Sequence, residues 1–362
     1  LKGTNKANDQ IILTGLTSEV TFENGVTLEN VTLDITGAVH NYLLNWKSGN
    51  VTVDNSYLSA SNNTKGCGLY AGGGTAGSVF YANKSEVHFN NNVQGDGGSG
   101  IWANSDGNQN AVFEFEHSTL TMNNNGLNGF LGQPASLLGG TAPTPTFTFT
   151  NTNVEAKGNG SPADGGNGDG FSYGYITLKN TDNGHYTFDV SGNDQNGLDG
   201  GRGNNAALDA QGYHIIANNN GKIGINISKL NEEKTESSII DCIVDANGNG
   251  SYGLQIKQPC SITDSQVTAN GNGADGIRFF SSSGNLSINN SSVTTDSNTG
   301  NGLYFSGKEL TTSGEKATII ANENTKSGLY FSGTSFTTFE NTIINLNSNQ
   351  NSGLGSIQVY TC

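Results

Sequence analysis

The sequence predicts an all-β fold, a right-handed parallel β-helix (β-solenoid), on three observations. A Gly-hydrophobic dipeptide recurs along the chain, short alternating segments lie between its copies, and no stretch has a helical period. From Gly170 on, successive copies are 23 to 29 residues apart. The hexapeptide Gly-Leu-Tyr-Phe-Ser-Gly even occurs twice, at 302–307 and 328–333. This spacing predicts about fourteen coils of roughly 26 residues each.

The composition fits a protein with a thin, continuous core. Of 362 residues, 33% are hydrophobic, below the roughly 45–50% (with Gly included) of an ordinary globular domain. Val, Ile, Thr, Phe and Tyr are nonetheless clustered all along the chain, which argues against disorder. In a solenoid, each coil buries one narrow face against its neighbours, and this composition is what such packing needs.

Charge and hydropathy exclude several partners and predict a location. The net charge of −15 argues against nucleic acid and anionic membranes, and no apolar run approaches the roughly 18–20 residues of a membrane span. No secretory leader opens the sequence, which suggests a mature fragment or a cytosolic protein. Sparse Lys with abundant Asn, Ser, Thr and Gly favours the former, so we expect an extracellular, cell-surface or cell-wall location.

The segments before each glycine have the pattern of half-buried strands. Apolar and polar residues alternate in Ser85–Asn90, Ser118–Asn123 and Ser265–Asn270, and each segment ends at Asn. Asn suits a turn with positive φ, and Asn side chains stacked from coil to coil can bond to one another and to the turn backbone. The segment Val20–Asp34 fits early coils with less regular turns.

The repeat is interrupted once. Between Gly129 and Gly170 the spacing widens to 41 residues, and this stretch holds Pro134, Pro143, Pro145 and Pro162. Insertions in solenoids become loops on one face, often the binding face. We therefore predict a single domain over residues 1–362 with a loop insertion around 132–169.

Alternation also assigns residues to the inside and the outside of the coils. If the hydrophobic residue after each Gly points inward, Ile256, Phe279, Phe305 and Phe331 join the core. The residues between them then form an outward stripe: Tyr70, Trp102, Leu131, Ser172, Asp199, Asn226, Gln255, Arg278, Tyr304 and Tyr330.

An exposed aromatic stripe on a rigid sheet is a sugar-binding surface, unless Tyr and Trp are there simply because they favour strands. Together with the charged residues near the insertion, the stripe predicts these ligand-binding residues: Tyr70, Trp102, Asp164, Asp169, Ser172, Asp199, Arg202, Asn226, Gln255, Arg278 and Tyr304. Only two arginines occur in the chain, and both are in this set.

Neither zinc nor another cofactor is predicted. The four cysteines, Cys67, Cys242, Cys260 and Cys362, lack C-x-x-C spacing, and the sequence does not choose between buried thiols and any of three disulfide pairings. Calcium is the one ion considered, with Asp164 and Asp169 as its candidate ligands.

The Gly-hydrophobic repeat resembles the right-handed parallel β-helices of the pectate-lyase-like superfamily along essentially the whole chain. Among non-enzymatic members, it is most similar to the binding regions of bacterial serine-rich-repeat adhesins. That resemblance implies a non-catalytic surface adhesin that binds a polysaccharide, host glycan or glycoprotein. Self-association, as in a passive stalk or fibre, is a further reading, because the superfamily fold serves many functions.

The alternative is a secreted polysaccharide lyase or glycoside hydrolase that acts on a pectin-like or other acidic polysaccharide. Its candidate catalytic residues are Asp169, Asp199 and Arg202. An inverting hydrolase needs two carboxyls roughly 6.5–9.5 Å apart, which Asp169 and Asp199 in adjacent coils would supply, and a lyase would use Arg202 as its base. Against this alternative, the chain has no Asp-Asp or Arg-Ile-Lys motif, and Gly184-His185-Tyr186 matches the hydrolases' Gly-His-Gly only in part.

Overall fold

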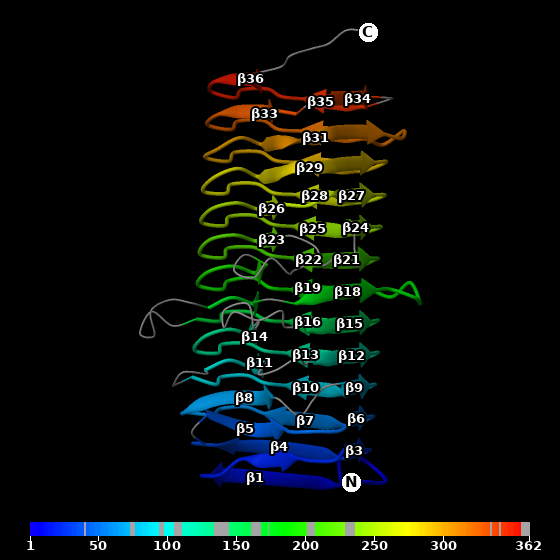
Figure 1. Ribbon diagram of the computed structural model, residues 1–362, viewed down its shortest axis with the longest axis vertical. Coiled ribbons are helices and arrows are strands. Elements are labelled where there is room, and N and C mark those ends of the chain that lie inside the picture. Colours follow the sequence, from blue (N-terminus) through cyan, green and yellow to red (C-terminus); the bar gives the residue numbers. More distant parts are fainter. Residues whose placement is uncertain are drawn as a thin grey trace. The chain divides into compact units, whose positions relative to one another are not determined.

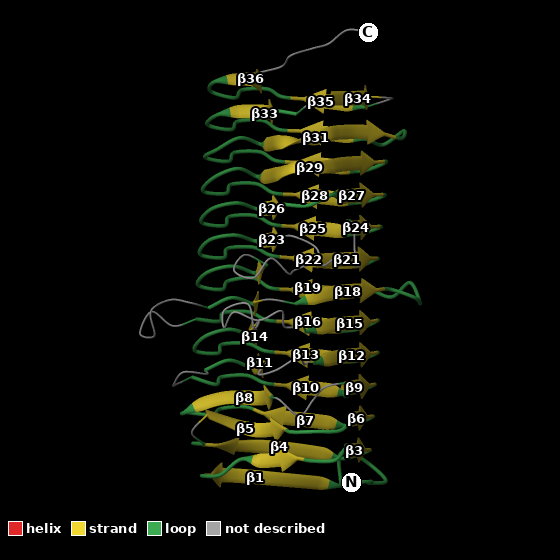
Figure 2. Ribbon diagram, viewed as in Figure 1, coloured by secondary structure: helices red, strands yellow, loops and turns green. Residues whose placement is uncertain are grey.

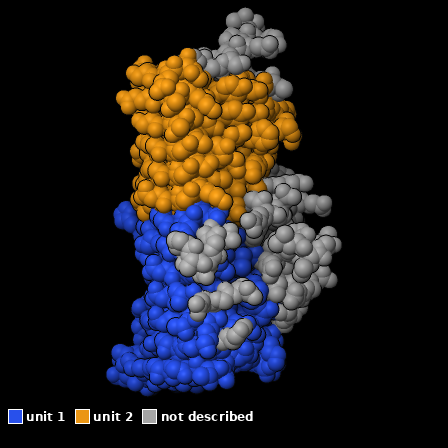
Figure 3. All heavy atoms as spheres, turned by 90° about the vertical axis from the view of Figure 1, so that its left-hand side faces the viewer, with its two compact units in different colours: residues 1–195 blue, residues 196–362 orange. Residues whose placement is uncertain are grey.

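A computed structural model describes the chain except for residues 40, 73–76, 94–97, 105–110, 134–144, 161–167, 173, 201–206, 229–235, 334, 340–341 and 356–362. At residues 104, 133, 335–339 and 352–355 it describes the backbone only. The described residues form strands and no helix (Figure 2). The chain divides into two compact units, Leu1–Gln195 and Asn196–Cys362, which Figure 3 colours separately. Whether they make up a single domain stays a prediction.

Unit 1 consists of coils with three strands each, and equivalent strands pair in parallel to form three rows (Figure 1). The first row holds β2 (Val20–Phe22), β5 (Asn41–Trp46), β8 (Gly66–Ala71), β11 (Ile101–Asn104), β14 (Phe130–Gln133) and β17 (Phe171–Ser172). The second row holds β3 (Val26–Glu29), β6 (Val51–Asp54), β9 (Val79–Asn83), β12 (Val112–Glu116), β15 (Thr146–Thr150) and β18 (Tyr175–Lys179). The third row holds β1 (Gln10–Leu16), β4 (Thr32–Gly37), β7 (Tyr57–Ala60), β10 (Glu86–His88), β13 (Thr119–Thr121), β16 (Asn153–Glu155) and β19 (Tyr186–Asp189).

Unit 2 repeats this plan, except that two strands run through both the first and the second row: β29 (Ile277–Asn289) and β31 (Leu303–Ser313). The rest of its first row is β20 (Leu198–Asp199), β23 (Ile225–Ile227), β26 (Leu254–Ile256), β33 (Ser327–Phe331) and β36 (Ser352–Gly355). The rest of its second row is β21 (Ala207–Gln211), β24 (Ser237–Ile240), β27 (Cys260–Thr263) and β34 (Ser335–Phe339). Its third row is β22 (Tyr213–Ile216), β25 (Ile243–Asp245), β28 (Gln266–Thr268), β30 (Ser292–Thr294), β32 (Thr318–Ile320) and β35 (Ile343–Asn345).

These rows confirm the predicted all-β parallel solenoid. The third-row strands found in the described part of the chain number thirteen, against about fourteen predicted coils. Within the range 132–169 that the sequence predicts as a loop insertion, strands β15 and β16 form an ordinary part of a coil. Residues 134–144 and 161–167 of that range lie outside the described residues.

In the core of each unit, inward side chains of one coil stack on the equivalent side chains of the next. In unit 1, Phe113 and Phe147 stack with centroids 4.6 Å apart, and Trp46 meets Phe113 edge-on. In unit 2, Phe305 stacks between Phe279 and Phe331, and all three are buried as the alternation predicts. Stacked aromatic rings add to the hydrophobic burial that holds successive coils together.

The recurring glycine is required by close backbone contact between coils. A Cβ on Gly253 would lie 2.7 Å from the carbonyl oxygens of both Ala246 and Gly276, and Gly276 is the same glycine one coil on. The three atoms nearest to such a Cβ are two backbone oxygens and the Cβ of Ala269, none of which can move aside without a shift of the backbone. The repeat therefore marks where the chain turns into the first row and where only hydrogen fits.

The predicted stacking of Asn side chains between coils is confirmed in both units, but the stacked residues lie two positions beyond the Asn that ends each predicted strand segment. These side chains, buried except at the half-buried Asn349, form a ladder in which the amide Nδ2 of one Asn donates to Oδ1 of the next at 2.9–3.1 Å. The members are Asn92, Asn125, Asn159 and Asn193 in unit 1, and Asn220, Asn249, Asn272, Asn298, Asn324 and Asn349 in unit 2. The residue before each ladder Asn has positive φ, as at Asn124 (55°) and Asn219 (56°). This turn geometry explains the Asn-rich and Gly-rich repeats.

The three described cysteines, Cys67, Cys242 and Cys260, are buried free thiols. Cys362 lies outside the described residues. The described residues thus support the reading of buried thiols, and no disulfide joins any two of those three.

Candidate functional site

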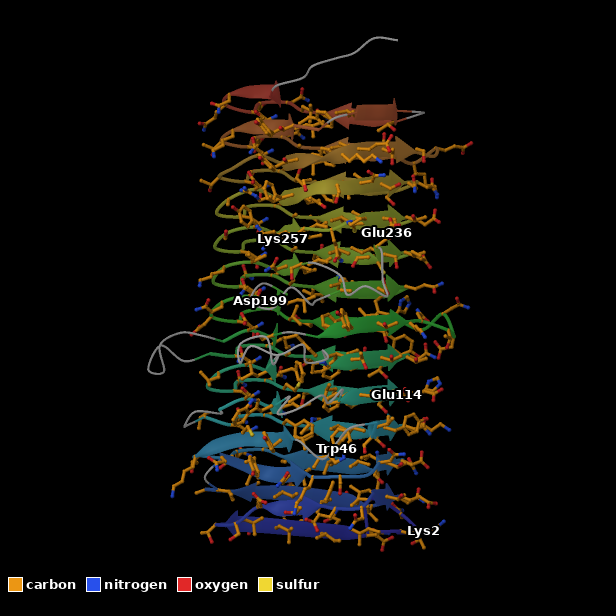
Figure 4. All side chains as sticks on the ribbon, in the orientation of Figure 1. Lys2, Trp46, Glu114, Asp199, Glu236 and Lys257 are labelled. Carbon is orange, nitrogen blue, oxygen red and sulfur yellow. The ribbon has the colours of Figure 1, made fainter. Side chains whose placement is uncertain are left out.

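The predicted outward stripe is a column of directly paired residues in unit 2. Strand register places each of its members beside the next, coil by coil. In chain order the column, called the unit 2 stripe below, is Asp199, Asn226, Gln255, Arg278, Tyr304 and Tyr330. Figure 4 labels Asp199, where the stripe begins.

Arg278 is held in the stripe by aromatic rings and one carboxylate. Its guanidinium carbon lies 5.1 Å from the ring centre of Tyr252 and 4.8 Å from that of Tyr304. Nη1 donates to the Tyr252 hydroxyl at 2.8 Å and lies 3.5 Å from Oδ2 of the buried Asp275. Phe280, 54% exposed, stands 6.0 Å from the guanidinium on the outer side of β29. These contacts fix the guanidinium at the surface in one orientation.

The two tyrosines of the stripe stack on each other. The rings of Tyr304 and Tyr330 are 4.8 Å apart and within 7° of parallel. Because Arg278 lies over the other side of Tyr304, both faces of that ring are occupied. Tyr304 therefore presents its edge to solvent, and a sugar ring cannot stack on it. The residue paired with Tyr330 in the next coil is Gly355, which brings no side chain against the ring.

At its other end the stripe is polar and buried. Asn226 donates from Nδ2 to Oδ1 of Asp199 at 2.8 Å, and both side chains are less than 10% exposed. Oδ1 of Asn226 is buried, and none of the described residues donates a hydrogen bond to it.

Unit 1 carries its own stripe on the first row. Register pairs Tyr70 with Trp102, Trp102 with Leu131, and Leu131 with Ser172. Tyr70 stacks on Tyr42 with centroids 4.6 Å apart, and the ring of Trp102 meets Tyr70 at 66°. The indole Nε1 of Trp102 is buried and has no hydrogen-bond acceptor among the residues that the structure describes.

The remaining predicted site residues are not brought together by the described structure. Asp164 and Arg202 lie outside the described residues. Asp169 precedes Gly170 in a turn, so it occupies a different place in its coil from Asp199, the second residue after Gly197. Asp169 belongs to unit 1 and Asp199 to unit 2. The catalytic pair and the calcium site therefore stay predictions, and no group of three metal-ligating side chains occurs among the described residues.

One triplet of the chain, Asn180-Thr181-Asp182, matches the Asn-Thr-Asp motif of polygalacturonase-like hydrolases. It lies in the turn between β18 and β19, which links the second row to the third, and not on the first row. Asp182 accepts from the backbone N–H of Gly184 at 2.9 Å and from the Tyr186 hydroxyl at 2.8 Å. The Gly184 bond is the main reason why the pKa of this carboxyl lies below its usual range. The triplet thus builds a turn.

No protein-family model matches the chain, and no curated protein matches it either. Among solved structures, the chain is similar to crystal structures of the periplasmic alginate epimerase AlgG and of two mutants of it. Identity is 11%, 12% and 14%, and TM-scores are 0.34, 0.32 and 0.32. Each comparison covers 91% of this chain and 73–75% of the other. So distant a likeness adds nothing to the functional argument.

Sequence reasoning missed the residues that shape the unit 2 stripe from its flanks. Tyr252 and Asp275 each precede a repeat glycine, and Phe280 lies two residues beyond Arg278. Their spacing from the glycines was readable, but a one-dimensional repeat does not show that a turn residue reaches over the strand of the next coil. Tyr42 in unit 1 was missed for the same reason. Within the described part of the chain, no helix is long and apolar enough to span a membrane.

Proposed function

We propose that this chain is a non-catalytic, carbohydrate-binding β-solenoid that holds an extended polysaccharide along the unit 2 stripe. The observation that carries the proposal is the register itself: six first-row residues, polar and buried at one end and aromatic and half-exposed at the other, stand one per coil. Coils repeat at about 4.8 Å, which is close to the length of one hexose residue in an extended chain. Each sugar over the half-exposed part, Gln255 to Tyr330, would therefore meet one member of the stripe.

The chemistry of the stripe suits sugars. Gln255 offers both donors and an acceptor, and Tyr330 offers one ring face that no stripe residue covers. Sugar hydroxyls pair with the polar groups, and the apolar face of a pyranose packs on an aromatic ring. We propose further that the chain acts at a bacterial surface, as an adhesin for host or plant glycans.

Binding to a panel of neutral and acidic polysaccharides tests the proposal. Gln255→Ala and Tyr330→Ala should each weaken binding of the same glycan. Ser261→Ala is the matched control, because Ser261 faces outward on β27 in the second row of unit 2 and should leave binding unchanged. If no glycan binds, or if the control weakens binding as much as the stripe variants do, the proposal is wrong.

The enzymatic alternative has its own test. The protein is incubated with pectin, polygalacturonate and mucin, and unsaturated or reducing chain ends are measured. A non-catalytic solenoid releases neither. Turnover that disappears in Asp199→Ala would establish the lyase or hydrolase instead.

A further inference from the structure

The guanidinium of Arg278 has one edge engaged and one edge open. Its hydrogen bond to Tyr252 and its ion pair with Asp275 both use Nη1. Neither Nε nor Nη2 has a partner among the described residues, and neither is a buried unpaired atom. With the side chain 31% exposed, these two nitrogens form an open fork at the surface.

The fork is rigidly held, which is unusual for a surface arginine. The guanidinium lies over the rings of both Tyr252 and Tyr304, and its Nη1 is paired with the carboxylate of Asp275. Asp275 is itself fixed, because its Oδ1 accepts from the backbone N–H and from Nδ2 of Asn301 at 2.7 and 2.9 Å. A ligand that binds the fork therefore pays little of the side-chain entropy that an ordinary arginine would lose.

The charge of its surroundings makes this fork selective. Arg278 is the one arginine among the described residues of a chain whose net charge is −15. A protein this acidic repels polyanions in general, so an anionic sugar needs a local positive group to bind at all. Two parallel N–H donors on a planar cation match the two oxygens of a planar carboxylate.

We propose that the Nε–Nη2 edge of Arg278 binds the carboxylate of a uronic acid residue, so that the stripe recognises an acidic polysaccharide. This inference rests on the proposed carbohydrate-binding function and deepens it. The uronate would lie level with Arg278, two coils from Tyr330, on which a second sugar ring of the same chain would stack. Gln255, beside Arg278 in the preceding coil, would bind the hydroxyls of a neighbouring sugar.

Calorimetric titration with an oligogalacturonide and with its carboxyl-reduced counterpart tests this proposal. The two probes have the same length and linkage and differ only in the carboxylate. We expect the acidic probe to bind the unchanged protein about 10- to 100-fold more tightly, the range of a charge-assisted bidentate pair. Arg278→Gln should abolish that preference, and Arg278→Lys, which keeps the charge without the fork, should restore only part of it.

Two controls separate the fork from other effects. Lys316→Gln removes one positive charge from the exposed turn between β31 and β32, and the preference should survive it. Asp275→Asn/Arg278→Gln avoids leaving Asp275 as an unpaired buried carboxylate, and it should lose the preference while unfolding at the temperature of the parent protein. A sulfated galactan, which is anionic but has no carboxylate, should bind more weakly than the uronide.

The outcomes distinguish this proposal from the one on which it rests. If both probes bind equally and Tyr330→Ala weakens both, the stripe binds carbohydrate but Arg278 reads no carboxylate. Equal binding of the sulfated galactan would likewise overturn the carboxylate assignment. If no probe or polysaccharide binds at all, the carbohydrate-binding function itself fails.

Discussion

Tyr330 stacks on Tyr304 at 4.8 Å, and on its other side the register brings only Gly355. The stack of Arg278, Tyr304 and Tyr330 therefore ends in an aromatic face that no stripe side chain covers. An aromatic residue whose faces are both occupied contributes rigidity, whereas one with an open face can take a ligand. The two tyrosines, identical in sequence context, thus have different roles.

This difference predicts an asymmetric effect of substitution on glycan binding. Tyr330→Ala should weaken binding about 3- to 10-fold, the range of one aromatic stacking contact. Tyr330→Phe, which keeps the ring, should bind almost as well as the parent. Affinity titrations with the best-bound polysaccharide check both variants. A Phe variant as weak as the Ala variant would mean that the hydroxyl, and not the ring face, binds the sugar.

A side chain should lower the stability of the protein at the repeat glycine but leave it almost unchanged at the turn glycine. In Gly253→Ala the new methyl meets two carbonyl oxygens at 2.7 Å, and we expect a loss of about 1–3 kcal/mol of stability, as for overpacking. Gly271 has φ of +62° and open space around it, and Asn219 has a φ of +56° in an equivalent turn. Gly271→Asn should be nearly neutral. Urea denaturation measures both changes, and equal losses would contradict the steric account.

The asparagine ladder should be a main source of stability in unit 2. Asn272 donates to Asn298 at 3.0 Å, and its Oδ1 accepts from the backbone N–H and Nδ2 of Asn249 at 2.9 and 3.1 Å. Asn272→Ala leaves the backbone N–H and Nδ2 of Asn249 without their acceptor, at about 1–3 kcal/mol per group. Oδ1 of Asn298 still accepts from the backbone N–H of residue 272. We expect a large drop in the urea midpoint, whereas Asn8→Ala, in an exposed turn of unit 1, should leave it unchanged. A small effect at Asn272 would show that water replaces the lost amide.

The fold could be predicted from the sequence because each coil of a solenoid has a similar length, so equivalent residues recur at a regular spacing. The glycine spacing predicted which residues pair between coils, and the alternation correctly placed Phe279, Phe305 and Phe331 inside. The site was readable only in part. Register follows from the period, but ring orientation does not, so the covering of both faces of Tyr304 could not be predicted.

The repeat spacing also does not predict the contacts that turn residues make. Tyr252 reaches Arg278 one coil on, and this contact depends on the path of a turn whose length varies between coils. Asp169 lies before Gly170, in the turn, and so it is not part of the outward column, in which Ser172 is the residue of that coil.

The buried thiols should be inert in the folded protein. Burial raises the pKa of Cys260 to about 12 and raises the pKa of Cys67 and Cys242 as well. A thiol reagent at pH 8 should modify these three cysteines only after denaturant is added, as peptide mapping by mass spectrometry would show. Rapid labelling of any of them without denaturant would contradict their burial.

The same thiols should make the protein less stable in alkali. Because the folded pKa of Cys260 lies above the ordinary value of 9.0, the unfolded chain loses its thiol proton first. The contribution to stability is complete below pH 9 and is lost progressively as the pH rises toward about 12. Cys260→Ala should show a shallower decline in the urea midpoint between pH 8 and pH 10.5 than the parent does. Parallel declines would mean that Cys260 contributes nothing to the alkaline loss.

His88 should make unit 1 sensitive to acid. Its ring lies against Tyr57 at 5.0 Å between centroids, and Nδ1 bonds the Thr121 hydroxyl at 2.7 Å. Burial lowers the pKa of His88 below the ordinary 6.5, although the carboxylates of Glu86, Asp34 and Glu155 oppose the shift. Because the folded pKa is depressed, the contribution of His88 is complete above pH 6.5 and is lost as the pH falls through the folded value.

Thermal unfolding of the parent and of His88→Asn between pH 7.5 and pH 5 measures this contribution. The parent should lose stability over that range more steeply than the variant, because the unfolded histidine takes up a proton that the folded one resists. The variant keeps a side chain able to bond Thr121, so its stability at pH 7.5 should stay close to that of the parent. If the two profiles run parallel, the carboxylates around His88 offset its burial, and acid sensitivity in unit 1 has another source.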